Sequence, residues 1–349
     1  MTSEEEKSTN NNNHNESFEI HECFGKDIID RYDGFILDQF GVLHNGAHGL
    51  EGAPELVQKL AGDYNKKLVI LSNSSSSSES CKAKLPKLGF DPKNFCNAVT
   101  SGEEAGKYIR DQYAGTTTPE GAMKKALWFT WKTKSSLSPL RFLELCGNIP
   151  VTTDPSEADY VVLHGVDLLR GPGADGEAEE VSLGDFFETG KLDGGSESES
   201  GDSPATTTIE SILQACAKRG LPMVCANPDF IMVKPDGSTG YMPGTIARRY
   251  TELGGSCVEF GKPHASHFEA CLRDLGLPRE KVAHVGDSLH HDIKGANDSR
   301  VDSVFVAGGV HRTELGSALN EVPSRDALDA LFEKHALMPT HVVPMFRME

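Results

Sequence analysis

The sequence has few of the features that mark secreted, membrane-spanning or nucleic-acid-binding proteins. Its eight cysteines are scattered and form no C-x-x-C pair, which favours reduced, mostly buried thiols. No apolar run approaches the length of a membrane span, and the first residues have neither a basic end nor an apolar stretch, so we expect a cytoplasmic protein. Basic residues are scarce as well. The 34 Lys and Arg face 52 Asp and Glu, and the net charge of −18 disfavours nucleic acid and anionic membranes as partners.

The 349 residues are enough for two domains. Residues 1–20 are polar and are predicted to form a disordered tail. Residues 21–100 alternate apolar strand-like runs with a helical pattern, which is typical of parallel βα units. A second α/β unit is expected over residues 101–240, and the first unit is expected to resume over residues 241–349. We therefore predict an α/β protein in which one unit is inserted into another.

Two details of this organisation are also expected from composition. Residues 171–204 are rich in Gly, Ser, Glu and Asp, which predicts a flexible acidic insertion without a catalytic role. Residues 304–307 are expected to form the last strand of the first unit.

Polar side chains stand where four predicted strands or tight turns end. Asp38 follows an apolar run, Ser72 ends a second one, Lys262 follows a glycine, and Asp287 follows a third run with Asp292 five residues later. Open parallel sheets place their ligands at the carboxyl ends of strands, so these side chains can converge on one crevice. Carboxylates that lie close together repel one another without a cation, and Mg²⁺ prefers oxygen ligands. The pattern predicts a site for a divalent cation and a phosphate.

In this order the four segments resemble motifs I to IV of the haloacid dehalogenase-like (HAD) hydrolase superfamily. Three further segments are similar to its subfamily IIA, the p-nitrophenyl phosphatase, phosphoglycolate phosphatase and pyridoxal phosphatase type: Cys225-Ala226-Asn227-Pro228-Asp229, Pro243-Gly244-Thr245 and Gly261-Lys262-Pro263. The resemblance spans about residues 33–310. It implies a doubly wound, Rossmann-like parallel-sheet core with an inserted α/β C2 cap that covers the active site, and a homo-oligomer formed through the cap is a further hypothesis.

The resemblance also implies a role for each motif residue. Asp38 would be the nucleophile that forms an aspartyl-phosphate, and Lys262 would pair with it. Ser72 and Asn73, together with Lys262, would bind the phosphate. The ligands of Mg²⁺ would be Asp38, the backbone carbonyl of Phe40, Asp287 and Asp292.

Two residues of the motif that ends in Asp229 have two interpretations in the sequence. The resemblance makes Asn227 and Asp229 a cap-hinge or substrate-facing pair, whereas an ordinary Asn-Pro-Asp turn is the equal alternative.

One position departs from the family pattern. Most HAD phosphatases carry a second aspartate two residues after the nucleophile, but this chain has Phe40, whose side chain cannot move a proton. General acid–base catalysis contributes about 10²- to 10⁴-fold. We therefore expect a Mg²⁺-dependent phosphatase for a small phosphoester that is slow unless another group supplies the proton, His44 being the first candidate.

Two alternatives remain open from the sequence. The first is a catalytically weak or inactive protein that binds a phosphoryl ligand. The second is a metal-free dehalogenase-like hydrolase, a branch in which an aromatic residue occurs at the position of Phe40. The presence of both Asp287 and Asp292 disfavours the second, because a metal-free site gains nothing from the extra carboxylate.

Overall fold

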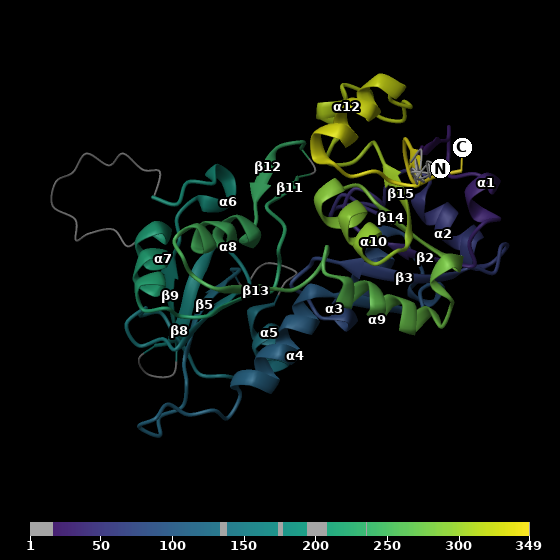
Figure 1. Cartoon of the computed structure of the whole chain (residues 1–349). Coiled ribbons are helices and arrows are strands. Elements are labelled where there is room, and N and C mark those ends of the chain that lie inside the picture. Colours follow the sequence, from purple (N-terminus) through teal and green to yellow (C-terminus); the bar gives the residue numbers. More distant parts are fainter. Residues whose placement is uncertain (1–16, 133–137, 174–176, 194–207, 235, 349) are drawn as a thin grey trace, which may run out of the picture.

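The computed structural model describes residues 17–132, 138–173, 177–193, 208–234 and 236–348. In this part of the chain two seven-stranded sheets form the centres of two α/β halves that lie side by side (Figure 1). The predicted fold class, a parallel-sheet α/β core with a second α/β unit, is confirmed. Among the described residues, no helix combines the length and the apolar character that crossing a membrane requires.

The first sheet, here called the core sheet, is parallel throughout. Its strands, in spatial order, are β1 (Glu19–Ile20), β16 (His341–Val343), β15 (Asp302–Val306), β14 (Val282–Gly286), β2 (Gly34–Leu37), β3 (Lys67–Ser72) and β4 (Asn97–Thr100). Every residue of β2 and β14 is buried, as expected for central strands of a parallel sheet that is covered on both faces.

Helices cover both faces of the core sheet. Their bounds are α1 (Lys26–Ile29), α2 (Ala53–Ala61), α3 (Ser78–Lys84), α9 (Ala265–Leu275), α10 (Lys294–Asp298), α11 (Arg312–Leu315) and α12 (Arg325–His335). Leu56 of α2 packs into one apolar cluster with Phe35 and Leu37, and Phe268 of α9 packs into another with Ile36 and Val69. Successive residues of β2 thus face opposite helix layers, because side chains alternate between the two faces of a strand.

The second sheet, here called the cap sheet, contains β5 (Ala126–Thr130), β6 (Val151–Thr152), β7 (Tyr160–Leu163), β8 (Leu168–Pro172), β9 (Ala178–Ser182), β10 (Met223–Cys225) and β13 (Cys257–Glu259). Its helices are α4 (Ser101–Tyr113), α5 (Pro139–Leu145), α6 (Phe186–Thr189), α7 (Ile209–Lys218) and α8 (Pro243–Glu252). A separate hairpin, β11 (Ile231–Val233) with β12 (Thr239–Tyr241), lies between the two halves (Figure 1).

The structure corrects the predicted start of the second core segment at residue 241. Helix α8 packs Ile246, Ala247 and Tyr250 into the apolar cluster of the cap half, and β13 pairs with β10 of the cap sheet. The cap half therefore extends to the end of β13, because the apolar face of α8 is buried there rather than against the core sheet.

Three other expectations also differ from the structure. The predicted tail of residues 1–20 includes β1, which is paired with β16, while residues 1–16 lie outside the described residues. The predicted flexible segment 171–204 contains β9 and α6, which are held by pairing with β8 and by buried Phe186; residues 174–176 and 194–207 lie outside the described residues. The last core strand is β16, because the chain returns after α12 to pair with β15.

Candidate active site

The polar strand ends meet at the carboxyl edge of the core sheet. The Lys262 ammonium lies 2.5 Å from Oδ1 of Asp38 and 2.7 Å from Oδ1 of Asp292. Asp38, Asp287 and Asp292 are all buried, and each offers an oxygen within 4.8 Å of the other two. The structure thus brings together four of the five residues that the motifs single out, all except Ser72, while their chemical roles stay predictions.

Asp292 is held by donors on both of its carboxylate oxygens. Oδ1 faces the Lys262 ammonium and Nε2 of His284, which is 2.8 Å away, and Oδ2 accepts a hydrogen bond from the Ser288 N–H at 3.0 Å. His284 stands inside the apolar strand β14, and its other ring nitrogen lies 3.1 Å from the Ile36 carbonyl. Sequence reasoning missed His284, although a histidine in an otherwise apolar buried strand was a signal that could have identified it.

Asp287 sits in a gap that only glycines leave open. A Cβ at Gly41 would come within 1.9 Å of Oδ2 of Asp287, and a Cβ at Gly309 within 2.1 Å. The Val310 N–H donates to the same oxygen at 2.8 Å. The loop after β15 therefore completes the site, and Val310 is a second contributor that the motifs did not reveal.

Burial and charge act against each other in this cluster. Burial raises the pKa of Asp38 to about 7; Lys262 lowers it, and Asp292 raises it further. Burial also raises the pKa of Asp287 well above its usual value, with added repulsion from Asp38 and Asp292. The pKa of Asp292 is lowered, because Lys262 and His284 outweigh its burial.

One buried lysine cannot balance three ionised carboxylates. The pKa of Lys262 is raised because Asp292 and Asp38 outweigh the effect of burial, so it stays charged. A divalent cation would remove the remaining repulsion and allow Asp38 and Asp287 to ionise. An all-oxygen set of this kind fits Mg²⁺ or Ca²⁺.

Asn73 joins the two halves at the site. Its Oδ1 accepts a hydrogen bond from the Lys262 backbone N–H at 2.6 Å, and its Nδ2 donates to Oδ1 of Asp229 at 2.7 Å. Gly261 has a φ of +117°, and a Cβ there would lie 2.4 Å from Oδ1 of Asn73. The structure thus places the Asn73 amide where it positions the Lys262 loop, and the predicted phosphate contact stays a prediction. Ser72, also predicted to bind phosphate, lines the cleft that opens from these residues.

The Asn-Pro-Asp segment makes both a local turn contact and contacts with the core half, while its predicted hinge or substrate-facing role stays a prediction. Asn227 is buried and its Oδ1 accepts from the Asp229 N–H at 3.0 Å, which is the turn contact expected of an asparagine at this position. The Asp229 carboxylate instead reaches the core half, where it contacts Asn73 and lies 3.5 Å from Nε2 of His291.

Phe40 lies at the mouth of the site with 39 % of its surface exposed. Its ring meets the ring of His44 edge-on, with centroids 4.7 Å apart. Nδ1 of His44 accepts a hydrogen bond from the Gly46 N–H at 3.1 Å, and burial lowers the pKa of His44 to about 4. His44 is therefore neutral near pH 7, and a neutral imidazole is a poor proton donor.

A cleft of about 1070 Å³ opens from these residues between the core half and the cap half. Four large apolar side chains that line it are exposed: Phe40, Ile231, Val233 and Leu319. Cationic side chains also line it: Lys84, Lys87, Lys234 and Arg312. The cleft can therefore accept an anionic group at its polar floor and an apolar group along its walls.

Three family models match segments of this chain. A model described as HAD-hydrolase-like matches residues 259–342, and two models described as haloacid dehalogenase-like hydrolases match residues 35–129 and 178–299.

Curated relatives cover most of the chain at low identity. Human chronophin is 24 % identical over 299 residues, which is 84 % of this chain and 87 % of the relative. The acid sugar phosphatase of Staphylococcus epidermidis strain ATCC 12228 is 25 % identical over 289 residues, with 81 % and 89 % covered.

Solved structures share the fold. A haloacid dehalogenase-like hydrolase from Brucella suis aligns with a TM-score of 0.61 and 23 % identity over 93 % of this chain and 98 % of the other. A glycerol phosphate phosphatase from Mycobacterium tuberculosis in complex with magnesium aligns with a TM-score of 0.51 and 17 % identity over 84 % and 74 %.

Proposed function

We propose that this chain, which belongs to the haloacid dehalogenase-like hydrolases, is a Mg²⁺-dependent phosphatase that hydrolyses a small phosphate monoester through an aspartyl-phosphate at Asp38. The observation that carries the proposal is the buried contact between Asp38 and Lys262, with Asp287 and Asp292 beside it. The phosphatases among the relatives support the same reaction class.

In the proposed reaction a carboxylate oxygen of Asp38 attacks phosphorus, and the bond between phosphorus and the ester oxygen breaks. The Lys262 ammonium, 2.5 Å from Asp38, favours the ionised form of that carboxyl and would donate to the phosphoryl oxygens as charge moves to the leaving group. Water then hydrolyses the acyl phosphate and regenerates Asp38.

Asp38, Asp287, Asp292 and the Phe40 carbonyl would hold Mg²⁺, which when bound supplies charge neutralisation for the phosphoryl group. Ser72 would donate its hydroxyl to a phosphoryl oxygen from the next strand end. Asn73 and Asp229 would act through position, because their contacts fix the Lys262 loop against the cap half.

The leaving group of the phosphate monoester is expected to determine the turnover rate at this site. Phe40 cannot protonate the departing oxygen, and His44 is neutral near pH 7. Esters whose oxygen leaves as a stabilised anion, such as aryl or acyl phosphates, do not need that proton. The apolar walls of the cleft suit an aryl group as well, so we propose activated monoesters as the preferred substrates.

The test compares two variants at the residues that flank strand β2, Asp38 and Asp33, on an aryl phosphate with Mg²⁺ present. Asp38→Asn keeps the size of the side chain and removes the attacking charge, so turnover should disappear while the circular dichroism spectrum stays the same. Asp33→Asn makes the same change at an exposed position just before the strand and should keep full turnover. Equal turnover in wild type and Asp38→Asn would contradict the covalent mechanism. A wild type that binds inorganic phosphate but turns over no ester would favour a phosphoryl-binding protein instead.

A further inference from the structure

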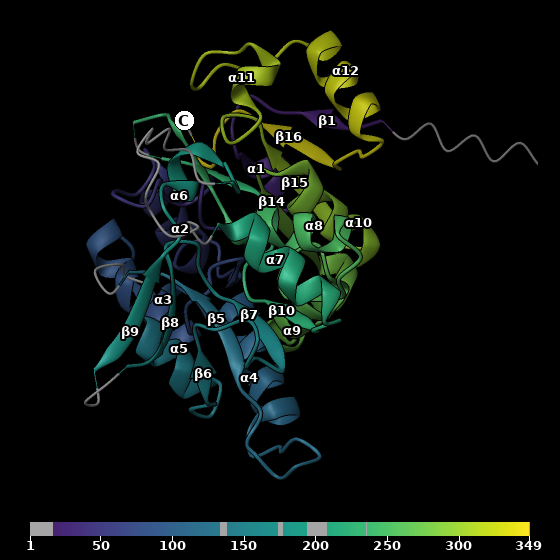
Figure 2. The same cartoon turned by 90° about the vertical axis from the view of Figure 1, so that its left-hand side faces the viewer.

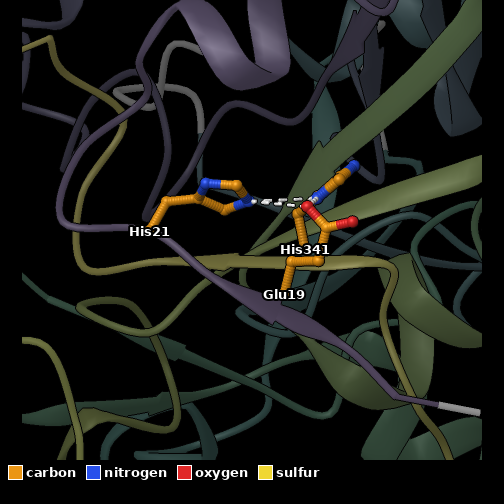
Figure 3. Close-up of side chains that lie close together, drawn as sticks. All are labelled: Glu19, His21 and His341. Carbon is orange, nitrogen blue, oxygen red and sulfur yellow. Dashed lines mark hydrogen bonds and ion pairs between the residues drawn. The ribbon is translucent and has the colours of Figure 1, made fainter.

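Three side chains with metal-binding atoms point toward one another at the edge of the core sheet (Figure 3). Glu19 belongs to β1, and His21 is the first residue after that strand. His341 begins β16, with which β1 pairs in parallel. This edge lies with α11 and α12 at one end of the molecule (Figure 2), and none of the three side chains lines the cleft. The proposed phosphatase reaction has no use for them.

The three ligand atoms are spaced like the corners of a tetrahedral site. Nε2 of His21 lies 3.1 Å from Nδ1 of His341, and Oε2 of Glu19 lies 3.7 Å from each of these nitrogens. A tetrahedral zinc ion bound at about 2.0–2.1 Å separates its ligand atoms by roughly 3.4 Å. A small shift of the partly exposed Glu19 toward the rings, with a slight widening of the contact between the two rings, would bring all three atoms to that spacing.

A chain of two hydrogen bonds, the one to His341 buried and the other partly buried, orients His341. The Tyr32 hydroxyl donates to Oδ2 of Asp302 at 2.8 Å, so its oxygen accepts from Nε2 of His341, which is 2.9 Å away. This fixes the proton on Nε2 and leaves the lone pair of Nδ1 directed at His21. Metal-binding histidines in proteins are commonly held in this way by a partner on the second ring nitrogen.

The charges of the three side chains suit a metal ion, and binding through Nε2 of His21 requires the proton that this nitrogen donates to His341 to move to Nδ1 of His21. Burial lowers the pKa of His21, and it lowers the pKa of His341 to about 4, so both rings are neutral near pH 7. The Arg31 guanidinium donates a hydrogen bond to each carboxylate oxygen of Glu19, at 2.9 and 2.8 Å, and lowers the pKa of that carboxyl. The guanidinium opposes an added cation, but Oε2 keeps a side that faces the two rings.

We propose that Glu19, His21 and His341 form a binding site for Zn²⁺ or a similar borderline transition metal, with a fourth position open to solvent. Two imidazole nitrogens and one carboxylate suit such a metal, whereas Mg²⁺ prefers the all-oxygen set of Asp38, Asp287 and Asp292. The bound ion would cross-link β1 and β16, and would thereby hold the start of the described chain against its last strand. Its occupancy would stabilise the core half and leave the chemistry of the cleft unchanged.

The test titrates the full chain with Zn²⁺ at saturating Mg²⁺, which occupies the carboxylate cluster. Wild type should retain one zinc ion per chain after dialysis, and zinc should raise its thermal midpoint. His21→Gln and Glu19→Gln should each weaken zinc binding at least about tenfold, and Tyr32→Phe, which removes the hydroxyl that joins His341 to Asp302, by about 10- to 100-fold. Co²⁺ in place of Zn²⁺ should give a visible spectrum typical of tetrahedral nitrogen and oxygen ligands.

The matched control is His335→Gln. His335 belongs to another histidine-containing group, with His311 and Glu314, and its substitution should leave the zinc affinity unchanged. Retained phosphatase activity and an unchanged Mg²⁺-induced thermal shift in the His21 and Glu19 variants would show that they are folded. Wild type without bound zinc at saturating Mg²⁺, or zinc that is lost in His335→Gln but kept in His21→Gln, would overturn the proposal.

Discussion

Replacing Phe40 with aspartate should change the leaving-group preference of the enzyme more than its stability. Phe40 is 39 % exposed, and full burial of a phenylalanine contributes about 1.5–3 kcal/mol, so losing the ring should cost roughly 1–2 kcal/mol of unfolding free energy. The introduced carboxyl would lie two residues from Asp38 and could protonate the ester oxygen. A positioned general acid contributes about 10²- to 10⁴-fold, or roughly 3–5 kcal/mol of the barrier.

The assay is kcat/KM for one alkyl and one aryl phosphate, measured with Mg²⁺ for wild type, Phe40→Asp and Phe40→Asn. The Phe40→Asn variant has nearly the same shape as Phe40→Asp but carries no titratable proton, so it reports the effect of the lost ring alone. We expect Phe40→Asp to raise the alkyl rate about 10²-fold or more over Phe40→Asn, and to raise the aryl rate far less. If Phe40→Asp and Phe40→Asn raise the rate on the alkyl phosphate equally, a missing proton donor does not limit that rate. A wild type already as fast on the alkyl ester would show that another group donates the proton.

Three further outcomes follow from the site. Lys262→Met should lower the unfolding free energy in urea at pH 8 without Mg²⁺ by about 3–5 kcal/mol, because it leaves the Asp38 and Asp292 carboxylates without their buried partner; an unchanged midpoint would contradict this. Gly261→Ala should cost at least about 1–3 kcal/mol and much of the activity, whereas Gly220→Ala, also at positive φ but with open space around it, should cost less and leave activity intact. The pKa of Asp38 is raised to about 7 in the folded protein, so the stability that the protonated Asp38 carboxyl contributes is fully present below about pH 4 and is lost as the pH rises through 7. Mg²⁺ should therefore raise the thermal midpoint more at pH 8 than at pH 5. A larger rise at pH 5 would refute this.

Local signals in the sequence predicted the α/β fold class and singled out the strand ends that carry the candidate site. The ends of α2 and α9 illustrate such signals, since Pro54 favours the first helical turn and Gly276 adopts the left-handed conformation that ends a helix. Asp38 and Asp287 could be placed together because neighbouring parallel strands end at the same edge of a sheet.

The contacts that tune the site were decided only by the tertiary structure. No local pattern reveals that Asn73 contacts Asp229, which lies 156 positions away, or that α8 buries its apolar face in the cap half. The same holds for His21 and His341, which are 320 positions apart and meet only because β1 and β16 pair. Periodicity and turn residues act within a few positions of the chain, whereas such pairings depend on which buried surfaces fit together once the whole chain has closed.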